Sequence, residues 1–238
     1  MITTRYSILT LAVAVLLCGC EKLRPEGAFT METITLQGDP HRIAVGSGFT
    51  LTLSDDIPAG EIRIGAHENI HPYIVCDQTG DQVSIYLETS RPYDRLQLEA
   101  WASPASFDDL TASGGSHIAT EEMLEAESLL LTLSGGSTME GKVTCGTLTA
   151  YLSGGSHATL AGSADALSLP DCSGGSALYA FPLACRTFDG NLSGGSHVEI
   201  SVSESLRADN SGGSTLYYKG DPQQLIVNNS GGSTVSKQ

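Results

Sequence analysis

The chain has 238 residues, and its 12 Lys and Arg against 27 Asp and Glu leave a formal net charge of −15. So acidic a chain is a poor partner for the phosphate backbone of nucleic acids or for anionic lipid headgroups. Only 16% of the residues are charged and 6% are aromatic, while 27 are Gly, a composition that favours a thin, elongated core over a broad globular one.

The N-terminus predicts a bacterial lipoprotein signal. A positively charged start, residues 1–5, is followed by a largely apolar run at residues 6–17, which is too short for a bilayer span of ~20 residues. The run closes on Leu-Cys-Gly-Cys at positions 17–20, which resembles the bacterial lipobox with its obligatory Cys. Residues 1–19 are therefore predicted to be a signal peptide, and Cys20 to be the lipidated first residue of the mature chain.

Several acyl chains at ~0.8 kcal/mol per buried CH₂ would hold such a protein stably on a membrane. We expect residues 20–30 to be the lipidated Cys and a tether. Glu21 follows the Cys in place of the Asp that often retains lipoproteins at the inner membrane, which favours the outer membrane. The sequence is compatible with both the periplasmic and the surface face.

The segment from residue 31 to residue 112 is rich in predicted strands. Alternating or apolar runs occur at residues 49–53, 61–64, 83–87 and 96–100, which is typical of half-buried strands. A solenoid needs atypical end coils to block edge-to-edge association. We therefore expect residues 31–112 to form irregular β coils ahead of the regular ones.

Seven copies of Ser-Gly-Gly-Ser divide the rest of the chain, residues 113–238, into repeats. They begin at Ser113, Ser134, Ser153, Ser173, Ser193, Ser211 and Ser230, a period of 18 to 21 residues. The second residue after every copy is apolar, from Ile118 to Val235, a register that flexible Gly/Ser linkers have no reason to keep. The fifth residue before most copies is also apolar, with Ser168 as the exception.

This register predicts an all-β fold, a right-handed parallel β-helix with coils of about 20 residues. Each coil would hold two alternating strands, a variable bend and a Ser-Gly-Gly-Ser corner. The glycines supply the positive φ of a sharp turn, and the serine hydroxyls are expected to stack between coils at the ~4.8 Å strand spacing.

The outward column two residues before each corner is the candidate ligand-facing column: Asp171, Asn191, Asp209 and Asn228. Stacked oxygens of this kind could hold Ca²⁺ or bond to sugar hydroxyls, although no cofactor is required by the sequence. Asp171 and Asp189 would lie roughly 8 Å apart, inside the ~6.5–9.5 Å window of inverting glycosidases. Pairing of Asp189 with Arg207 on the next coil argues against catalysis.

Histidines and cysteines give weaker signals. His117, His157 and His197 lie on alternate coils, ~9.6 Å apart, too far to share one zinc ion. Cys145 and Cys185 are also two coils apart, with Asp165 expected between them, which exceeds the ~7 Å disulfide limit between Cα atoms. A disulfide of Cys76 is left open.

Several motifs in order resemble the auto-transporter adhesin head GIN domain family. They are Gly48-Phe-Thr-Leu-Thr-Leu53, the serine-glycine corners, and Leu216-Tyr-Tyr-Lys-Gly-Asp-Pro222 followed by the last corner. The resemblance covers nearly all of the mature chain. It implies a right-handed parallel β-helix with a binding or adhesion role, and it carries over no catalytic residues.

Two hypotheses follow for the function. The first is a non-catalytic envelope lipoprotein that presents the β-helix faces to polysaccharide or to a cell-surface protein. The second is a polysaccharide-acting enzyme, a glycoside hydrolase or a pectin lyase-like protein, that uses the aspartate face. Fold analogy alone is a weak warrant for the enzyme.

Overall fold

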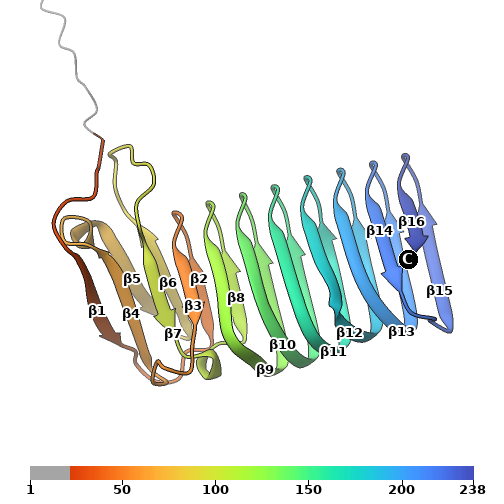
Figure 1. Ribbon diagram of the computed structural model, residues 1–238, viewed down its shortest axis with the longest axis horizontal. Coiled ribbons are helices and arrows are strands. Elements are labelled where there is room, and N and C mark those ends of the chain that lie inside the picture. The colour runs from red at the N-terminus through yellow and green to blue at the C-terminus, as the bar shows by residue number, and fades with distance from the viewer. Residues whose placement is uncertain (1–21) are drawn as a thin grey trace, which may run out of the picture.

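The computed structural model describes residues 22–238. The predicted signal peptide and the predicted lipidated Cys20 lie outside these residues. The described chain forms a 16-stranded sheet wound into a parallel β-solenoid of about seven turns of roughly 19 residues (Figure 1). In this part of the chain, no helix is long and apolar enough to cross a membrane.

The strands of the N-terminal part are β1 (Phe29–Thr35), β2 (Arg42–Val45), β3 (Thr50–Leu53), β4 (Glu61–His67), β5 (Ile74–Thr79), β6 (Gln82–Leu87), β7 (Glu99–Ala102) and β8 (Asp109–Ala112). The remaining strands are β9 (His117–Leu133), β10 (Thr138–Leu152), β11 (His157–Cys172), β12 (Ala177–Leu192), β13 (His197–Asn210), β14 (Thr215–Lys219), β15 (Gln224–Asn229) and β16 (Thr234–Lys237). Two short 3₁₀ turns, η1 (His71–Tyr73) and η2 (Pro104–Ser106), complete the elements.

Each strand from β9 to β13 is long and bent, and forms nearly one whole coil. Neighbouring coils pair in parallel, and the Ser-Gly-Gly-Ser corners line one long edge of the solenoid, at the top of Figure 1. The bends of the long strands lie along the opposite edge. The predicted parallel β-helix with coils of about 20 residues is confirmed.

The apolar register seen in the sequence is the core of the solenoid. Residues in the second position after a corner share one inward column, and all but the last are at most 1% exposed: Ile118, Met139, Ala158, Leu178, Val198 and Leu216. Burial of a complete aliphatic side chain is worth about 1.5–3 kcal/mol. The stacked columns therefore account for the order of the coils as well as their cohesion.

The corners need glycine at both central positions. The first Gly of each corner has φ between +59° and +62°, and the second between +74° and +77°, values that other residues reach only with strain. The expected hydroxyl contact between coils is made by Ser156 and Ser176, at 3.5 Å. Four other closing serines donate to the carbonyl of their own corner's first Ser, as Ser116 does to Ser113 at 2.8 Å.

A β-bulge at Pro170 shifts the third repeat by one residue. The column that holds Leu148 and Phe188 contains Leu167, where counting back from the corner places Ser168. The residue between Cys145 and Cys185 is likewise Ala164 and not Asp165, which corrects the sequence-based placement. Proline has no N–H to donate to a ladder, so a bulge is where a strand tolerates it.

The N-terminal part combines parallel and antiparallel pairing. β2 and β3 pair in parallel with β8 and β9 and start the solenoid, whereas β1, β4 and β7 pair antiparallel, as do β5 and β6. Leu23, inside the expected tether, is 2% exposed and forms a bridge to Tyr93. The chain is therefore packed against the domain from about this residue onward.

Candidate functional site

The predicted polar column lines a cavity of about 300 Å³ near the C-terminal corners. Asn191, Asp209 and Asn228 are register neighbours on successive coils, and Asp171 lines the same cavity. Their polar groups already have partners in the chain. The Asn228 amide donates to the Asp209 carboxylate at 2.6 Å, and Ser173 donates to Asp171 at 3.2 Å.

The acidic side chains of this column form no metal cluster among the described residues. In residues 22–238, no group of three or more His, Cys, Asp or Glu side chains is placed to hold a metal ion. Asp189 is paired with Arg207 at 3.9 Å, as the sequence predicted. Within the column, Asn228 bonds to Asp209, while Asn191 donates to the Pro170 carbonyl at 3.3 Å. The remaining polar atoms could offer hydrogen bonds to a polar ligand.

The histidines stand in a row with tyrosines along another face. Ring centroids are 6.5 Å apart for His157 and Tyr179, 5.6 Å for Tyr179 and His197, and 5.4 Å for His197 and Tyr217. His197 also contacts Glu199 at 3.0 Å. The rings contact one another along the solenoid axis. We therefore interpret this row as packing between coils rather than as a stacking surface for a ligand.

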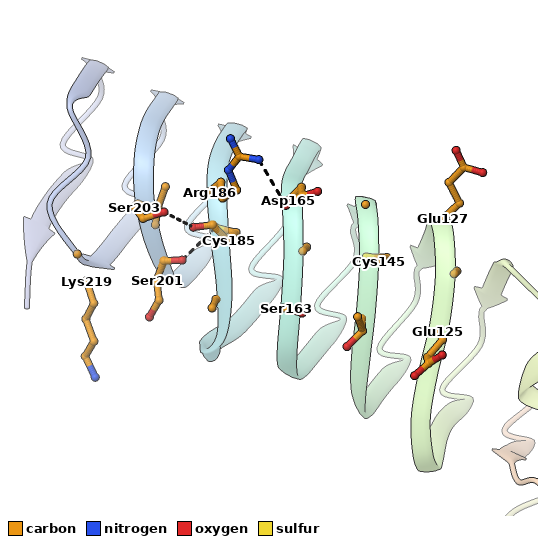
Figure 2. Close-up of a pocket in the computed structure, with 17 residues that line it drawn as sticks. Glu125, Glu127, Cys145, Ser163, Asp165, Cys185, Arg186, Ser201, Ser203 and Lys219 are labelled. Atoms are coloured by element: carbon orange, nitrogen blue, oxygen red, sulfur yellow. Dashed lines mark hydrogen bonds and ion pairs between the residues drawn. The ribbon is translucent and has the colours of Figure 1, made fainter.

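A groove of about 1000 Å³, called here the axial groove, lies along the bends of the coils (Figure 2). It runs from β9 to the end of β14 and crosses every long strand. Five successive strands at ~4.8 Å span ~19 Å. An elongated ligand could therefore lie along the axis and contact each coil.

The floor of the axial groove is a column of small side chains in register. It consists of Ala126, Cys145, Ala164, Cys185 and Val202. None is larger than valine, and from Cys145 onward each is at most 8% exposed. The flanking columns are mixed, with long side chains such as Glu125 and Arg186 beside small residues such as Gly146 and Ala184.

Polar side chains form the two walls. One wall carries Glu125, Thr144, Ser163 and Ser201 at the same level of the coils, with Ala184 in that column on β12, and ends near Lys219. Its hydroxyls and carboxylate can form hydrogen bonds on four of the five long strands. Lys219 turns its ammonium over the Phe181 ring, 4.1 Å from the centroid.

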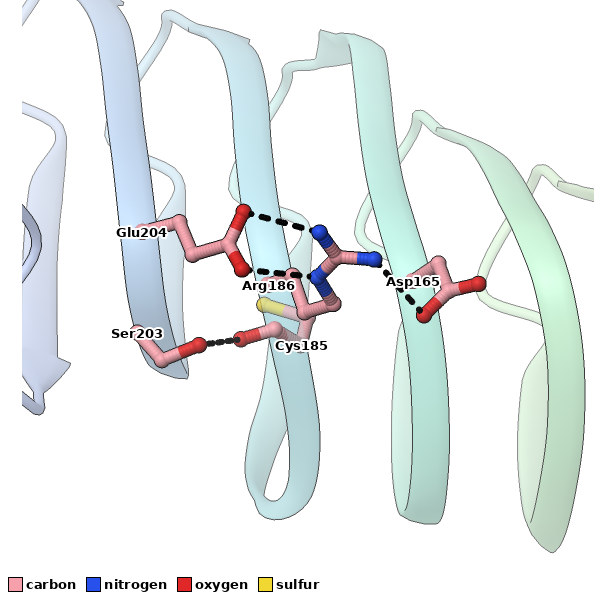
Figure 3. A network of polar contacts seen from close by, with 5 residues as sticks. All are labelled: Asp165, Cys185, Arg186, Ser203 and Glu204. Carbon is pink, nitrogen blue, oxygen red and sulfur yellow. Dashed lines mark hydrogen bonds and ion pairs between the residues drawn. The ribbon is translucent and has the colours of Figure 1, made fainter.

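The other wall is organised around Arg186 (Figure 3). Its guanidinium donates two hydrogen bonds to Glu204, at 2.8 and 3.1 Å, and contacts Asp165 at 3.7 Å. A hydrogen bond from Arg186, with its positive charge, lowers the pKa of Glu204. Glu127 stands on the same wall but has no such cation beside it, so the charge of the groove is uncompensated at its β9 end.

The cysteines of the floor are not nucleophiles. All four cysteines in the described chain are free, and burial raises the pKa of Cys185 to about 12. Burial, with the charge of Asp165, also raises the pKa of Cys145. The Cys185 thiol donates to the Ser201 carbonyl at 3.0 Å. A thiol that stays protonated at neutral pH packs as a small apolar side chain.

The sequence reasoning missed the axial groove and found the polar column. The column follows from counting back two residues from each corner. The groove lies at the bend, where coil length varies, and the bulge at Pro170 hides the register of its floor. Its signal in the sequence is one small or Val residue eight or nine positions before each corner from Ser134 to Ser211.

The family model described as “Putative auto-transporter adhesin, head GIN domain” matches residues 39–222. No curated protein matches the chain. The chain is similar to a solved structure from Bacteroides fragilis titled a putative adhesin, with 17% identity, a TM-score of 0.80, and coverage of 91% of this chain and 100% of that one.

Two further solved structures are similar. A putative adhesin from Parabacteroides merdae has 19% identity and a TM-score of 0.68, with coverage of 91% and 99%. A structure from Parabacteroides distasonis titled a putative lipid binding protein has 17% identity and a TM-score of 0.71, with coverage of 92% and 100%. At such identities these likenesses show the fold alone.

Proposed function

Since the chain belongs to the auto-transporter adhesin head GIN domain family, we propose that it is a non-catalytic binding module of the bacterial cell envelope. Its ligand is a linear polysaccharide that lies along the axial groove. The observation that carries this proposal is the groove itself, about 1000 Å³ of continuous surface across successive coils.

The chemistry of the groove suits a sugar polymer. Sugar rings offer apolar C–H faces to a floor of small side chains, and hydroxyls to polar walls such as Thr144, Ser163 and Ser201. An extended protein segment is the other class of ligand that could use these walls. A polymer that touches each coil gains affinity from many weak contacts, as adhesion to a repetitive surface requires.

The protein is held at the outer membrane, in this proposal, by lipid on Cys20. The predicted signal peptide and lipobox support this part. The first described residue lies at the opposite end of the solenoid from β15 and β16 (Figure 1). The long axis would then carry the groove away from the bilayer.

Catalysis on the aspartate face has little support from the geometry. Asp189 is engaged by Arg207, and Asp209 accepts a hydrogen bond from Asn228. Among the described residues, the lining of the polar column includes no histidine, lysine or arginine. A general acid would have to come from a carboxyl group in an open, polar setting.

A glycan array followed by calorimetry tests the proposal. Ser163→Arg places a long side chain across one wall at an exposed position, and it should weaken binding at least about tenfold. Thr159→Arg, on the same coil but outside the groove, is the matched control and should bind normally. Equal binding by both variants would locate the ligand elsewhere.

Product analysis separates binding from turnover. The parent chain should retain the glycan without shortening it. Depolymerised product that disappears in Asp171→Asn and Asp209→Asn would overturn the non-catalytic proposal in favour of the enzyme. Glycan binding that is lost in Asp209→Asn but kept in Ser163→Arg would move the site to the polar column.

A further inference from the structure

The last coil of the solenoid presents an open edge. β15 pairs only with β13, and β16 only with β14, among the described residues. The outer backbone groups of both strands face away from the sheet. Unpaired strand edges of this kind are templates for pairing with another chain.

The core columns also end at this coil without a cover. Leu225 is 50% exposed, although Leu206 and Phe188, in the same inward column, are 0% and 2% exposed. Ile226 beside it is 50% exposed as well. An isolated end coil normally carries a polar cap, whereas here apolar side chains continue to the edge.

The charge of the last coil differs from that of the rest of the chain. Residues 222–238 contain no Asp or Glu and one Lys, in a chain with a net charge of −15. That lysine, Lys237, is already bonded to Asp221. Copies of so acidic a protein repel each other over most of their surface, and this end is where two copies can approach without that penalty.

The opposite end of the solenoid is built differently. Its edge strands β1 and β5 are antiparallel to their neighbours, and β1 carries the exposed Glu32 and Met31. A contact that uses the same edge twice needs only self-complementarity, and it closes as a two-fold dimer.

We propose that the C-terminal coil docks the C-terminal coil of a second copy of this chain. The edge strands β15 and β16 pair antiparallel with those of the partner copy, and Leu225, Val227 and Val235 become buried between the two cores. The N-termini then point in opposite directions. With a lipid anchor on each copy, as in the proposed function on which this last step rests, the dimer would join molecules on two facing membranes.

Light scattering coupled to size exclusion tests the pairing on residues 22–238, without ligand or anchor. Over a concentration series up to about 100 μM, the parent chain should approach twice the monomer mass. Leu225→Lys places an inward-pointing charge on the edge and should remain monomeric. Met31→Lys, a matched change of an exposed apolar side chain at the other end, should still dimerise.

A monomeric parent chain, a dimeric Leu225→Lys variant or open-ended oligomers would each overturn the proposal. Circular dichroism checks that the variant keeps its strands. Hydrogen exchange gives a second measurement, because backbone amides of β15 and β16 should become more protected as the parent concentration rises. Protection that stays constant also contradicts the pairing. Glycan binding is measured separately, so the two proposals fail independently.

Discussion

Asn210 is a polar residue in a position built for leucine. It continues the inward column of Leu133, Leu152, Cys172 and Leu192. Its side chain is 2% exposed, and neither its amide nitrogen nor its amide oxygen has a hydrogen-bond partner. We expect Asn210→Leu to stabilise the protein.

Three terms set the magnitude. An unpaired buried polar group costs about 1–3 kcal/mol, and that penalty disappears. Burying a leucine side chain adds about 1.5–3 kcal/mol, while the larger volume in a packed column takes back about 1–3 kcal/mol. The net gain in the free energy of unfolding is about 1–3 kcal/mol, which raises Tm by about 3–10 °C for a domain of this size.

Urea unfolding followed by circular dichroism measures this gain, with Asn191→Leu as control. Asn191 lies one coil earlier on the outer face and is exposed, so its replacement should change stability by less than about 1 kcal/mol. An Asn210→Leu variant that is no more stable than the parent would refute the reasoning, since it would mean that the amide is satisfied in solution.

Three further outcomes are expected. Gly154→Ala should destabilise the protein more than Gly155→Ala, by about 1 kcal/mol or more. Both glycines have positive φ, but only at Gly154 would a Cβ approach a neighbouring backbone nitrogen, at 3.0 Å. Thermal melts of the two variants measure the difference, and an equal loss of stability would contradict the prediction. The pKa of Cys185 is about 12 in the folded state, against 9.0 for a free thiol. At pH 8, Cys185 of the folded protein should therefore react with iodoacetamide about a thousandfold more slowly than a free thiol, and fast labelling of the native protein would contradict this. The stability that the protonated thiol contributes should fall as pH rises from about 9 to about 12. Arg186→Met should raise the pKa of Glu204 in an NMR titration, and an unchanged pKa would show that the ion pair does not form in solution. Because Arg186 lowers the pKa of Glu204 in the folded state, the ion pair stabilises the fold at pH values above the ordinary carboxyl pKa. This stabilisation is lost as pH falls through the folded-state pKa.

Periodicity was enough to predict the coils. Gly at both corner positions has one physical cause, positive φ, and the apolar second residue after each corner has another, burial. Neither depends on details elsewhere in the chain. The predicted serine stack is limited to Ser156 and Ser176 among the described residues. Other serine hydroxyls bond to their own corner, as Ser116 does to Ser113, and spacing alone does not rank the two acceptors.

The candidate site was predictable only where it is tied to a corner. Asp209 and Asn228 lie two residues before their corners, and they are neighbours in the structure. The bend is different, because one inserted residue at Pro170 changes which side chain meets Cys145 and Cys185. The antiparallel pairing of β1 with β4 could not be predicted from periodicity, because this part of the sequence contains no repeat.

Side chains vary more at the bends than at the corners. A Cβ on the first glycine of a corner would lie 2.9–3.3 Å from a backbone nitrogen of the preceding turn, so a side chain at that position is disfavoured. Side chains at the bends have no such limit, and along one wall of the axial groove they change from Glu127 through Asp165 to Arg186. Since β9 contributes Glu125 and Glu127 to the groove, whereas β12 contributes the cation Arg186, the groove is more negative at β9 than at β12. A ligand with a charged group would therefore bind in one direction, although the corners that frame it repeat almost identically.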